Sequence, residues 1–75
     1  MVHHHRALSA FGLNIRKTRE AKSLTQERLA EKADLDPTYI SGIERGVRNP
    51  SFLSIIRIAK ALGTTVSDLS SGVER

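Results

Sequence analysis

The segment from Leu24 to Asn49 constrains the fold most, because it has the pattern of two short helices separated by a few residues. Thr25 is a good N-cap before the run QERLAEKA, in which apolar residues recur at helical spacing. Asp36 is a second N-cap, and Pro37 follows it at the first helical position, where the missing N–H costs nothing. We therefore expect a second helix from Pro37 to Arg45.

The connection between these helices is short. Only Asp34 and Leu35 clearly separate them, which matches the three-to-four-residue turn of a helix-turn-helix unit. Asp34 has to tolerate a left-handed backbone conformation there, and Gly46 is the usual stop after the second helix. A helix of this kind fits the major groove and turns its N-terminal residues towards the base edges. The segment therefore predicts binding to duplex DNA.

Three further helices are expected around this pair. The first runs from about Leu8 to Lys22, the fourth from about Phe52 to Leu62, and a short fifth from about Val66 to Ser71. Thr65 and Asp68 have the spacing of a capping box at the start of the fifth. The predicted apolar face of the fourth helix consists of Phe52, Ile55, Ala59 and Leu62. Short helices with short connections predict an all-α, compact five-helix bundle.

The ends of the chain are expected to lie outside this bundle. Residues 1–6, MVHHHR, are predicted to be a disordered segment, and their histidines are also compatible with a tag remnant. Three consecutive histidines on a mobile end fix no metal geometry, so we expect no metal site. The domain is expected to span residues 7–71, followed by a fraying tail at 72–75.

Composition limits the class of protein. The chain has no cysteine, and its 75 residues form a small core, so helix packing and self-association are expected to stabilise it. No apolar run approaches about 20 residues and no signal-peptide pattern is present, so we expect a cytoplasmic protein without a membrane partner. Twelve Lys+Arg against eight Asp+Glu give a net charge of +4, which suits a polyanionic partner. No nucleophile arrangement, phosphate-binding glycine loop or ligand cluster suggests an enzyme, a cofactor or a small-molecule effector.

A family resemblance follows from the order of several motifs. TQERLA, the YIS-IERG helix, RNPS and IAKALG, between residues 11 and 69, resemble the phage-repressor and Cro type of helix-turn-helix domain, called Xre-like. The resemblance implies a lambda-repressor-like DNA-binding fold. Ser23 and Asp34 stand where that family usually has glycine. Pro37 stands where many relatives place a long polar or basic side chain that contacts bases.

A narrower resemblance concerns DPTYISGIERGVRN, which is similar to the controller proteins of restriction–modification systems. It implies a homodimer that binds a pseudo-palindromic operator upstream of its own gene. Such a protein activates, and at higher concentration represses, its own gene and the endonuclease gene. RNA polymerase is a further partner that this regulation would involve.

Candidate DNA contacts fall into two groups. We expect base readout by Pro37, Thr38, Ser41 and Arg48, with Pro37 limited to an apolar contact such as a thymine methyl. We expect phosphate contacts from Gln26, Tyr39, Arg45 and Asn49. Alternative interpretations make Tyr39 a half-buried core residue, Arg45 a partner of its own helix C-terminus, and Arg48 a solvated loop charge. Gly42 either relieves crowding or allows close approach to the DNA.

Two structural roles complete the set. In the resembled family, an arginine late in the first helix pairs with a glutamate near the end of the recognition helix; the matching residues are Arg19 and Glu44. The expected dimer interface consists of Leu53, Ile56, Val66 and Leu69. An alternative is that a loop or the tail covers these four side chains.

Two other functions stay open beside the controller hypothesis. One is a generic prophage-type repressor or antitoxin that acts partly through protein–protein contacts. The other is a module that keeps this fold but docks on another protein. Binding to duplex DNA that weakens steeply with salt distinguishes a DNA-binding protein from such a module.

Overall fold

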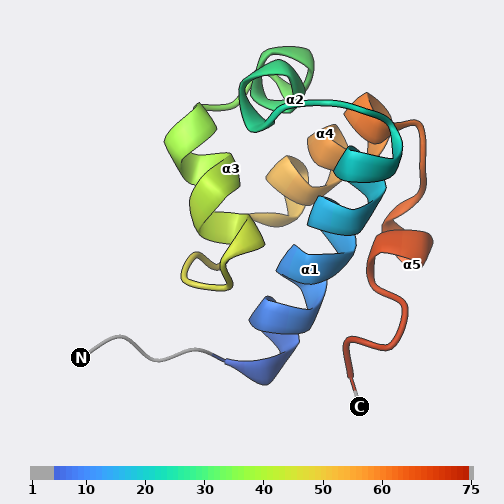
Figure 1. Ribbon diagram of the computed structural model, residues 1–75. Helices are drawn as coiled ribbons and strands as arrows, with labels where there is room; N and C mark the ends of the chain where they lie inside the picture. Colours follow the sequence, from blue (N-terminus) through green and yellow to red (C-terminus); the bar gives the residue numbers. More distant parts are fainter. Residues whose placement is uncertain (1–4, 75) are drawn as a thin grey trace.

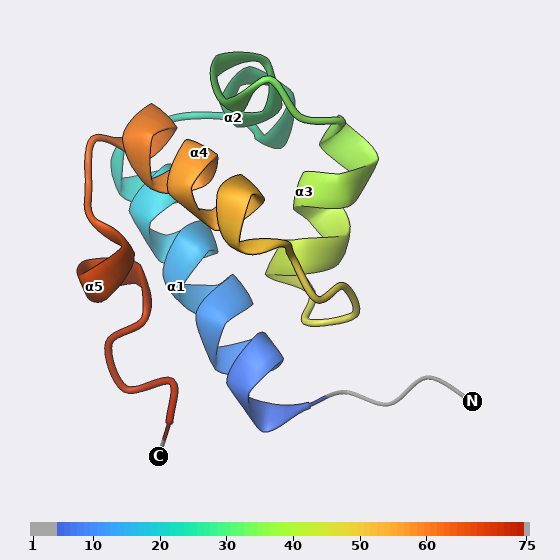
Figure 2. The same ribbon diagram turned by 180° about the vertical axis from the view of Figure 1, so that it is seen from behind.

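The computed structural model describes residues 5–74, which form five helices and, within that range, no strand (Figure 1). The helices are α1 (Arg6–Ala21), α2 (Gln26–Ala33), α3 (Pro37–Glu44), α4 (Phe52–Leu62) and α5 (Val66–Leu69). The long α1 packs against α3 on one side and α5 on the other, and α4 passes in front of α1 in the view of Figure 2. Helix α2 packs against both α3 and α4. The predicted all-α bundle is confirmed.

Every helix contributes to one hydrophobic core. The buried apolar side chains are Phe11, Ile15, Leu29, Ala30, Ala33, Ile40, Ile43, Ile58, Ala59, Leu62 and Leu69. Side-chain N-caps define where three of the helices begin, and two of these caps, Thr25 and Asp36, were predicted. The Thr25 hydroxyl accepts the N–H of Arg28 at 3.0 Å, and the Asp36 carboxylate accepts the N–H of Thr38 at 2.7 Å. Ser51 caps α4 in the same way.

The apolar face predicted for α4 is wrong at its first residue. Phe52 is 69% exposed, whereas Ile58 is fully buried. The buried face instead follows Ser54, Ile58 and Leu62, which are spaced four residues apart. Phe52 lies two residues before Ser54 and therefore on the opposite side of the helix. The packing of α4 against α2 sets this rotation, which the sequence pattern alone left ambiguous.

The N-terminal boundary also differs from the prediction. Helix α1 begins at Arg6, and the imidazole Nδ1 of His5 accepts the N–H of Ala7 at 3.1 Å as the cap. His5 and Arg6 therefore belong to the folded domain and not to a disordered segment. Residues 1–4, with the remaining histidines of the predicted tag remnant, lie outside the described residues.

The C-terminal tail is more ordered than expected. The side-chain amide of Asn14 donates to the carbonyl oxygens of Leu69 at 2.8 Å and Ser71 at 3.0 Å. Val73 is half-buried and packs against the core. The chain up to residue 74 therefore folds onto α1, while Arg75 lies outside the described residues.

Glycine allows α1 and α3 to approach closely. A Cβ atom added to Gly12 would lie 2.2 Å from the carbonyl oxygen of Ile43. Any larger residue would push the two helices apart, so Gly12 fixes the position of α3 on α1. Over the described residues, no helix is both long and apolar enough to cross a membrane.

Candidate nucleic-acid interface

Helix α3 has one buried face and one open face. Ile40, Ile43 and Glu44 are buried against the rest of the domain. Pro37 and Thr38, in the first turn, are exposed. Ser41, one turn later, is half-buried, and Arg45, which caps the end of the helix, is exposed. The face predicted for base readout is therefore open to solvent at Pro37, Thr38 and Arg45 and partly covered at Ser41.

The turn before α3 sets its direction. Asp34 adopts the left-handed conformation expected from the sequence, with φ 56° and ψ 48°. The N–H of Leu35 donates to the carbonyl oxygen of Ala30 at 2.9 Å, which satisfies the end of α2. Helix α2 ends at Ala33 and α3 begins at Pro37, so three residues, 34–36, connect the two helices. Aspartate thus fills the position where the resembled family usually has glycine.

Arg19 and Glu44 form the ion pair that the resemblance implied. Arg19 Nε lies 2.7 Å from Glu44 Oε2, and Nη2 lies 2.9 Å from Oε1. The third donor, Arg19 Nη1, reaches the carbonyl oxygen of Leu24 at 2.8 Å. The hydrogen bond to Glu44 is the largest cause of a raised pKa for Arg19. The pair joins α1 to the last turn of α3 and leaves only 2% of the Glu44 side chain exposed.

Gln26 belongs to the same network. Its Nε2 donates to Glu44 Oε1 at 3.0 Å, so the first residue of α2 is tied to the end of α3. An amide nitrogen carries two N–H groups, so one donor remains free of this bond. The residue is half-buried at a helix N-terminus, where backbone N–H groups and the helix dipole favour an anion. This geometry is compatible with the predicted phosphate contact.

Tyr39 connects α3 to the loop that follows it. It is half-buried against the core, and its hydroxyl oxygen accepts the N–H of Ser51 at 3.2 Å. Hydrogen bonding to the Ser54 side chain lowers the pKa of Tyr39 most, and the Ser51 contacts and the Arg48 charge act in the same direction. The ring of Tyr39 is therefore half-buried against the core, as the alternative interpretation expected. Its hydroxyl lies at the loop.

The basic residues lie on the open side. Arg48 is exposed, with its Cζ 6.0 Å from the centroid of the Tyr39 ring. Arg45 Nε donates to Ser41 Oγ at 3.4 Å, and Asn49 is exposed in the loop. The structure thus brings Thr38, Ser41 and Arg45 onto one helix face, with Arg48 beside them.

Comparison with known proteins identifies the family. A family model described as helix-turn-helix matches residues 15–69. The chain belongs to the Xre-like helix-turn-helix family. It is 44% identical over 66 residues to control protein C.MunI from Mycoplasma sp, covering 87% of this chain and 89% of that protein.

Two solved structures agree with this family assignment. The restriction–modification controller protein C.AhdI from Aeromonas hydrophila has a TM-score of 0.85 and 42% identity, covering 87% of this chain and 98% of that one. The C.Esp1396I controller protein, solved as a tetramer in complex with its natural 35-base-pair operator, has a TM-score of 0.77 and 46% identity. That match covers 81% of this chain and 80% of the other. The predicted resemblance to controller proteins is confirmed.

An apolar surface lies on α4 of this Xre-like chain. Leu53 is 58% exposed and Ile56 is half-buried, so the predicted dimer contact at these two residues stays a prediction. Phe52, which was assigned to the core, lies four residues before Ile56 and extends the same surface. The position of Phe52 next to Leu53, in the first turn of the helix, could have indicated from the sequence that Phe52 belongs to this surface.

The predicted interface is wrong at Leu69. This side chain is only 1% exposed and belongs to the core, because α5 packs against both α1 and α4. Val66 is half-buried and packs against the same core. The available apolar surface therefore lies on α4, at Phe52, Leu53 and Ile56.

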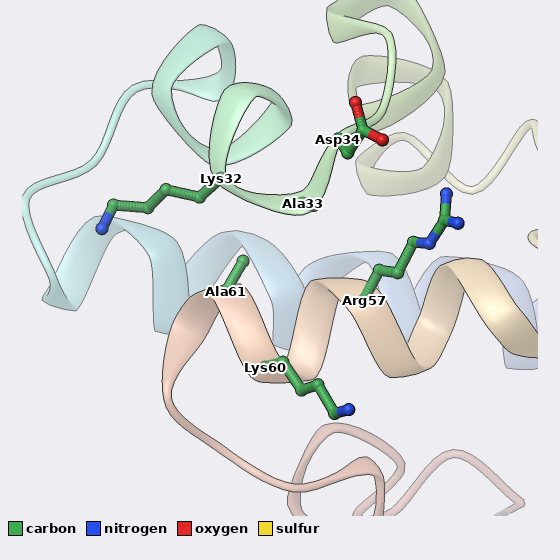
Figure 3. A pocket seen from close by; sticks show the side chains of 6 residues that line it. All are labelled: Lys32, Ala33, Asp34, Arg57, Lys60 and Ala61. Atoms are coloured by element: carbon green, nitrogen blue, oxygen red, sulfur yellow. The ribbon is translucent and has the colours of Figure 1, made fainter.

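A shallow hollow of about 340 Å³ lies between α2 and α4 (Figure 3). It is lined by Lys32, Ala33, Asp34, Arg57, Lys60 and Ala61. The three cationic side chains point in different directions, so they do not converge on one ligand. Within residues 5–74, no group of three or more His, Asp or Glu residues is arranged to hold a metal ion.

Proposed function

We propose that this protein is a sequence-specific, DNA-binding transcriptional regulator, and that it acts as the controller protein of a restriction–modification system. The observation that carries the proposal is the presentation of α3. One face is fixed to the domain through Glu44, and the other presents Thr38 and Ser41 to solvent beside Arg48. A helix presented in this way fits the major groove of B-DNA.

The proposed base contacts differ in how much they discriminate. Arg48 discriminates most, because a guanidinium can bind the O6 and N7 atoms of guanine with two hydrogen bonds. Thr38 and Ser41 can each donate or accept, so alone they discriminate little. Pro37 offers only an apolar surface to a thymine methyl group.

The proposed phosphate contacts surround this face. Gln26 lies at the N-terminus of α2, Tyr39 and Asn49 lie beside the loop, and Arg45 ends α3. Phosphate contacts fix the register of a protein on DNA without specifying sequence. The relative C.Esp1396I, solved on its operator, supports a role in operator binding for this chain.

A homodimer would complete the binding unit. Two copies related by a two-fold axis through the α4 surface would place their α3 helices about 34 Å apart, in successive major grooves. Phe52 and Leu53, together with Ile56, supply the apolar area for this contact. We infer a pseudo-palindromic operator upstream of the protein's own gene, autoregulation together with the endonuclease gene, and a contact with RNA polymerase during activation. The protein would act in the cytoplasm without an effector.

The same α4 surface favours one other candidate function. A prophage-type repressor or antitoxin would use Phe52 and Leu53 to hold a different protein while α3 binds DNA. A stable homodimer in the absence of any other protein would favour the controller function over the prophage-type repressor or antitoxin.

Selection of bound duplexes from a random pool tests the proposal. We expect enrichment of two inverted half-sites with centres about 34 Å apart. A reporter gene placed behind the selected sequence should be activated at low protein concentration and repressed at high concentration. A pool that remains random after repeated selection contradicts sequence-specific binding.

A further inference from the structure

Gly42 is buried although it lies on the outer face of α3. It follows Thr38 by four residues, so both lie on the side of the helix opposite Ile40 and Ile43. The atoms that cover it belong to Arg48. A Cβ atom added to Gly42 would lie 2.5 Å from Arg48 Cγ and 3.5 Å from Arg48 Cβ and Nε.

The backbone does not explain this glycine. The positive φ values among the described glycines occur at Gly46, Gly63 and Gly72, and not at Gly42. Glycine inside a helix lowers helix stability relative to alanine. At Gly12 the reason is the backbone of a neighbouring helix. At Gly42 the three nearest atoms all belong to one arginine side chain, so Arg48 occupies the space where a Cβ atom would lie.

The start of the loop holds Arg48 against α3. The N–H groups of Val47 and Arg48 donate to the carbonyl oxygen of Gly42 at 3.0 and 3.2 Å. The aliphatic part of Arg48 then crosses the helix at Gly42, and its guanidinium lies near the Tyr39 ring. The backbone N–H, the aliphatic side chain and the guanidinium of Arg48 therefore all lie beside α3.

We propose that Gly42 is a positioning residue for Arg48: its missing side chain leaves a channel across α3 that directs the guanidinium towards the base edges. This proposal rests on the proposed function. A long side chain loses rotational freedom when it binds, and a preorganised side chain loses less. An alanine at this position would displace the arginine while leaving its charge on the protein.

The packing can be tested without DNA. In the NMR spectrum of the wild-type protein, we expect nuclear Overhauser effects between the Hα protons of Gly42 and the Hγ protons of Arg48. Gly42→Ala should remove the contact between these two residues and keep the helical circular dichroism spectrum and the melting temperature, because alanine is favoured in helices. Absence of these effects in the wild type overturns the proposal, whatever the DNA measurements give.

The role in recognition requires a double-mutant cycle. The measured quantity is the ratio of Kd for random duplex to Kd for the selected duplex. Arg48→Ala should lower this ratio by roughly 5- to 150-fold, the range for one bidentate base contact. Gly42→Ala should lower it towards the same value, and the double variant should be no worse than Arg48→Ala alone. Lys60→Ala, which removes one exposed charge on α4, is the matched control and should keep the ratio.

The outcomes separate this proposal from the proposed function. An unchanged ratio in Gly42→Ala, or effects that multiply in the double variant, overturns the positioning role while leaving sequence-specific binding intact. A wild-type protein that binds no duplex overturns the proposed function, and with it any role of Gly42 in reading DNA. The Overhauser effects would still be observed in that case.

Discussion

Arg19 and Glu44 make two parallel hydrogen bonds, of 2.7 and 2.9 Å, between the end of α1 and the end of α3. Gln26 donates to the same carboxylate and joins the start of α2 to this pair. Three helices thus meet at one buried carboxylate. The position of the helix proposed to enter DNA is therefore coupled to a polar network on the buried side of α3.

Removal of either partner of this pair should destabilise the domain strongly. Arg19→Ala leaves the Glu44 carboxylate buried without its cation, so we expect a loss of about 3–5 kcal/mol in the free energy of unfolding. The double variant Arg19→Met with Glu44→Leu should lose less than either single change, because no charge is left unpaired. Urea unfolding measures the free energy of unfolding of Arg19→Ala, of each single change and of the double variant. A loss below about 1 kcal/mol for Arg19→Ala, the value for an exposed pair, contradicts this account.

Gln26→Ala should weaken DNA binding without changing sequence preference. The proposed contact is to phosphate, so affinity for the selected duplex and for random duplex should fall by the same factor. Fluorescence anisotropy with both duplexes measures this. A loss confined to the selected duplex would instead place Gln26 among the base contacts.

Arg48→Ala should relax discrimination at one operator position by roughly 1–3 kcal/mol. The measurement is a competition between the selected duplex and duplexes changed one base pair at a time. Equal losses on selected and random DNA would identify Arg48 as a phosphate contact.

Ile56→Glu should give a monomer, because a carboxylate in an apolar dimer contact would be desolvated without a partner. Analytical ultracentrifugation measures the oligomeric state. Leu13→Glu is the control, since Leu13 is an apolar residue that is 47% exposed but lies on α1. A dimer that persists in Ile56→Glu moves the interface away from α4.

Tyr39 should ionise below its ordinary pKa of about 10. It is the one tyrosine in a chain without tryptophan, so the ultraviolet absorbance of tyrosinate reports it alone. Ser54→Ala should raise this pKa more than Arg48→Ala, because the Ser54 hydrogen bond is the largest cause of the shift. A pKa lowered by folding adds stability above the unfolded value, and this stability is lost as pH falls through the folded value. A midpoint at or above about 10 would contradict the described hydrogen bonds.

Local signals in the sequence were sufficient for the helices and the turn. Thr25, Asp36 and Ser51 are caps whose side chains accept N–H groups two or three residues ahead, so short segments determine them. Asp34 adopts the left-handed conformation that the short turn requires. The fold class and the open face of α3 followed from these signals together with the family resemblance.

Long-range packing explains the errors. Phe52 was predicted in the core but is exposed, and Leu69 was predicted in the dimer interface but is buried. Both errors arise because the rotation of α4 and the position of α5 depend on helices elsewhere in the chain. Asn14 holds the end of α5 across 55 residues, a contact that no local pattern indicates. The role of Gly42 could not be predicted from the sequence either, because Arg48 contacts Gly42 only when the loop folds back over α3.

Fluorescence anisotropy at two salt concentrations tests most directly whether α3 binds the major groove of a specific duplex. We predict tight binding to the selected duplex, weaker binding to random duplex, and a steep loss of both affinities as salt rises, because bound phosphates release counterions. Equal and negligible binding to every duplex at low salt would contradict the account.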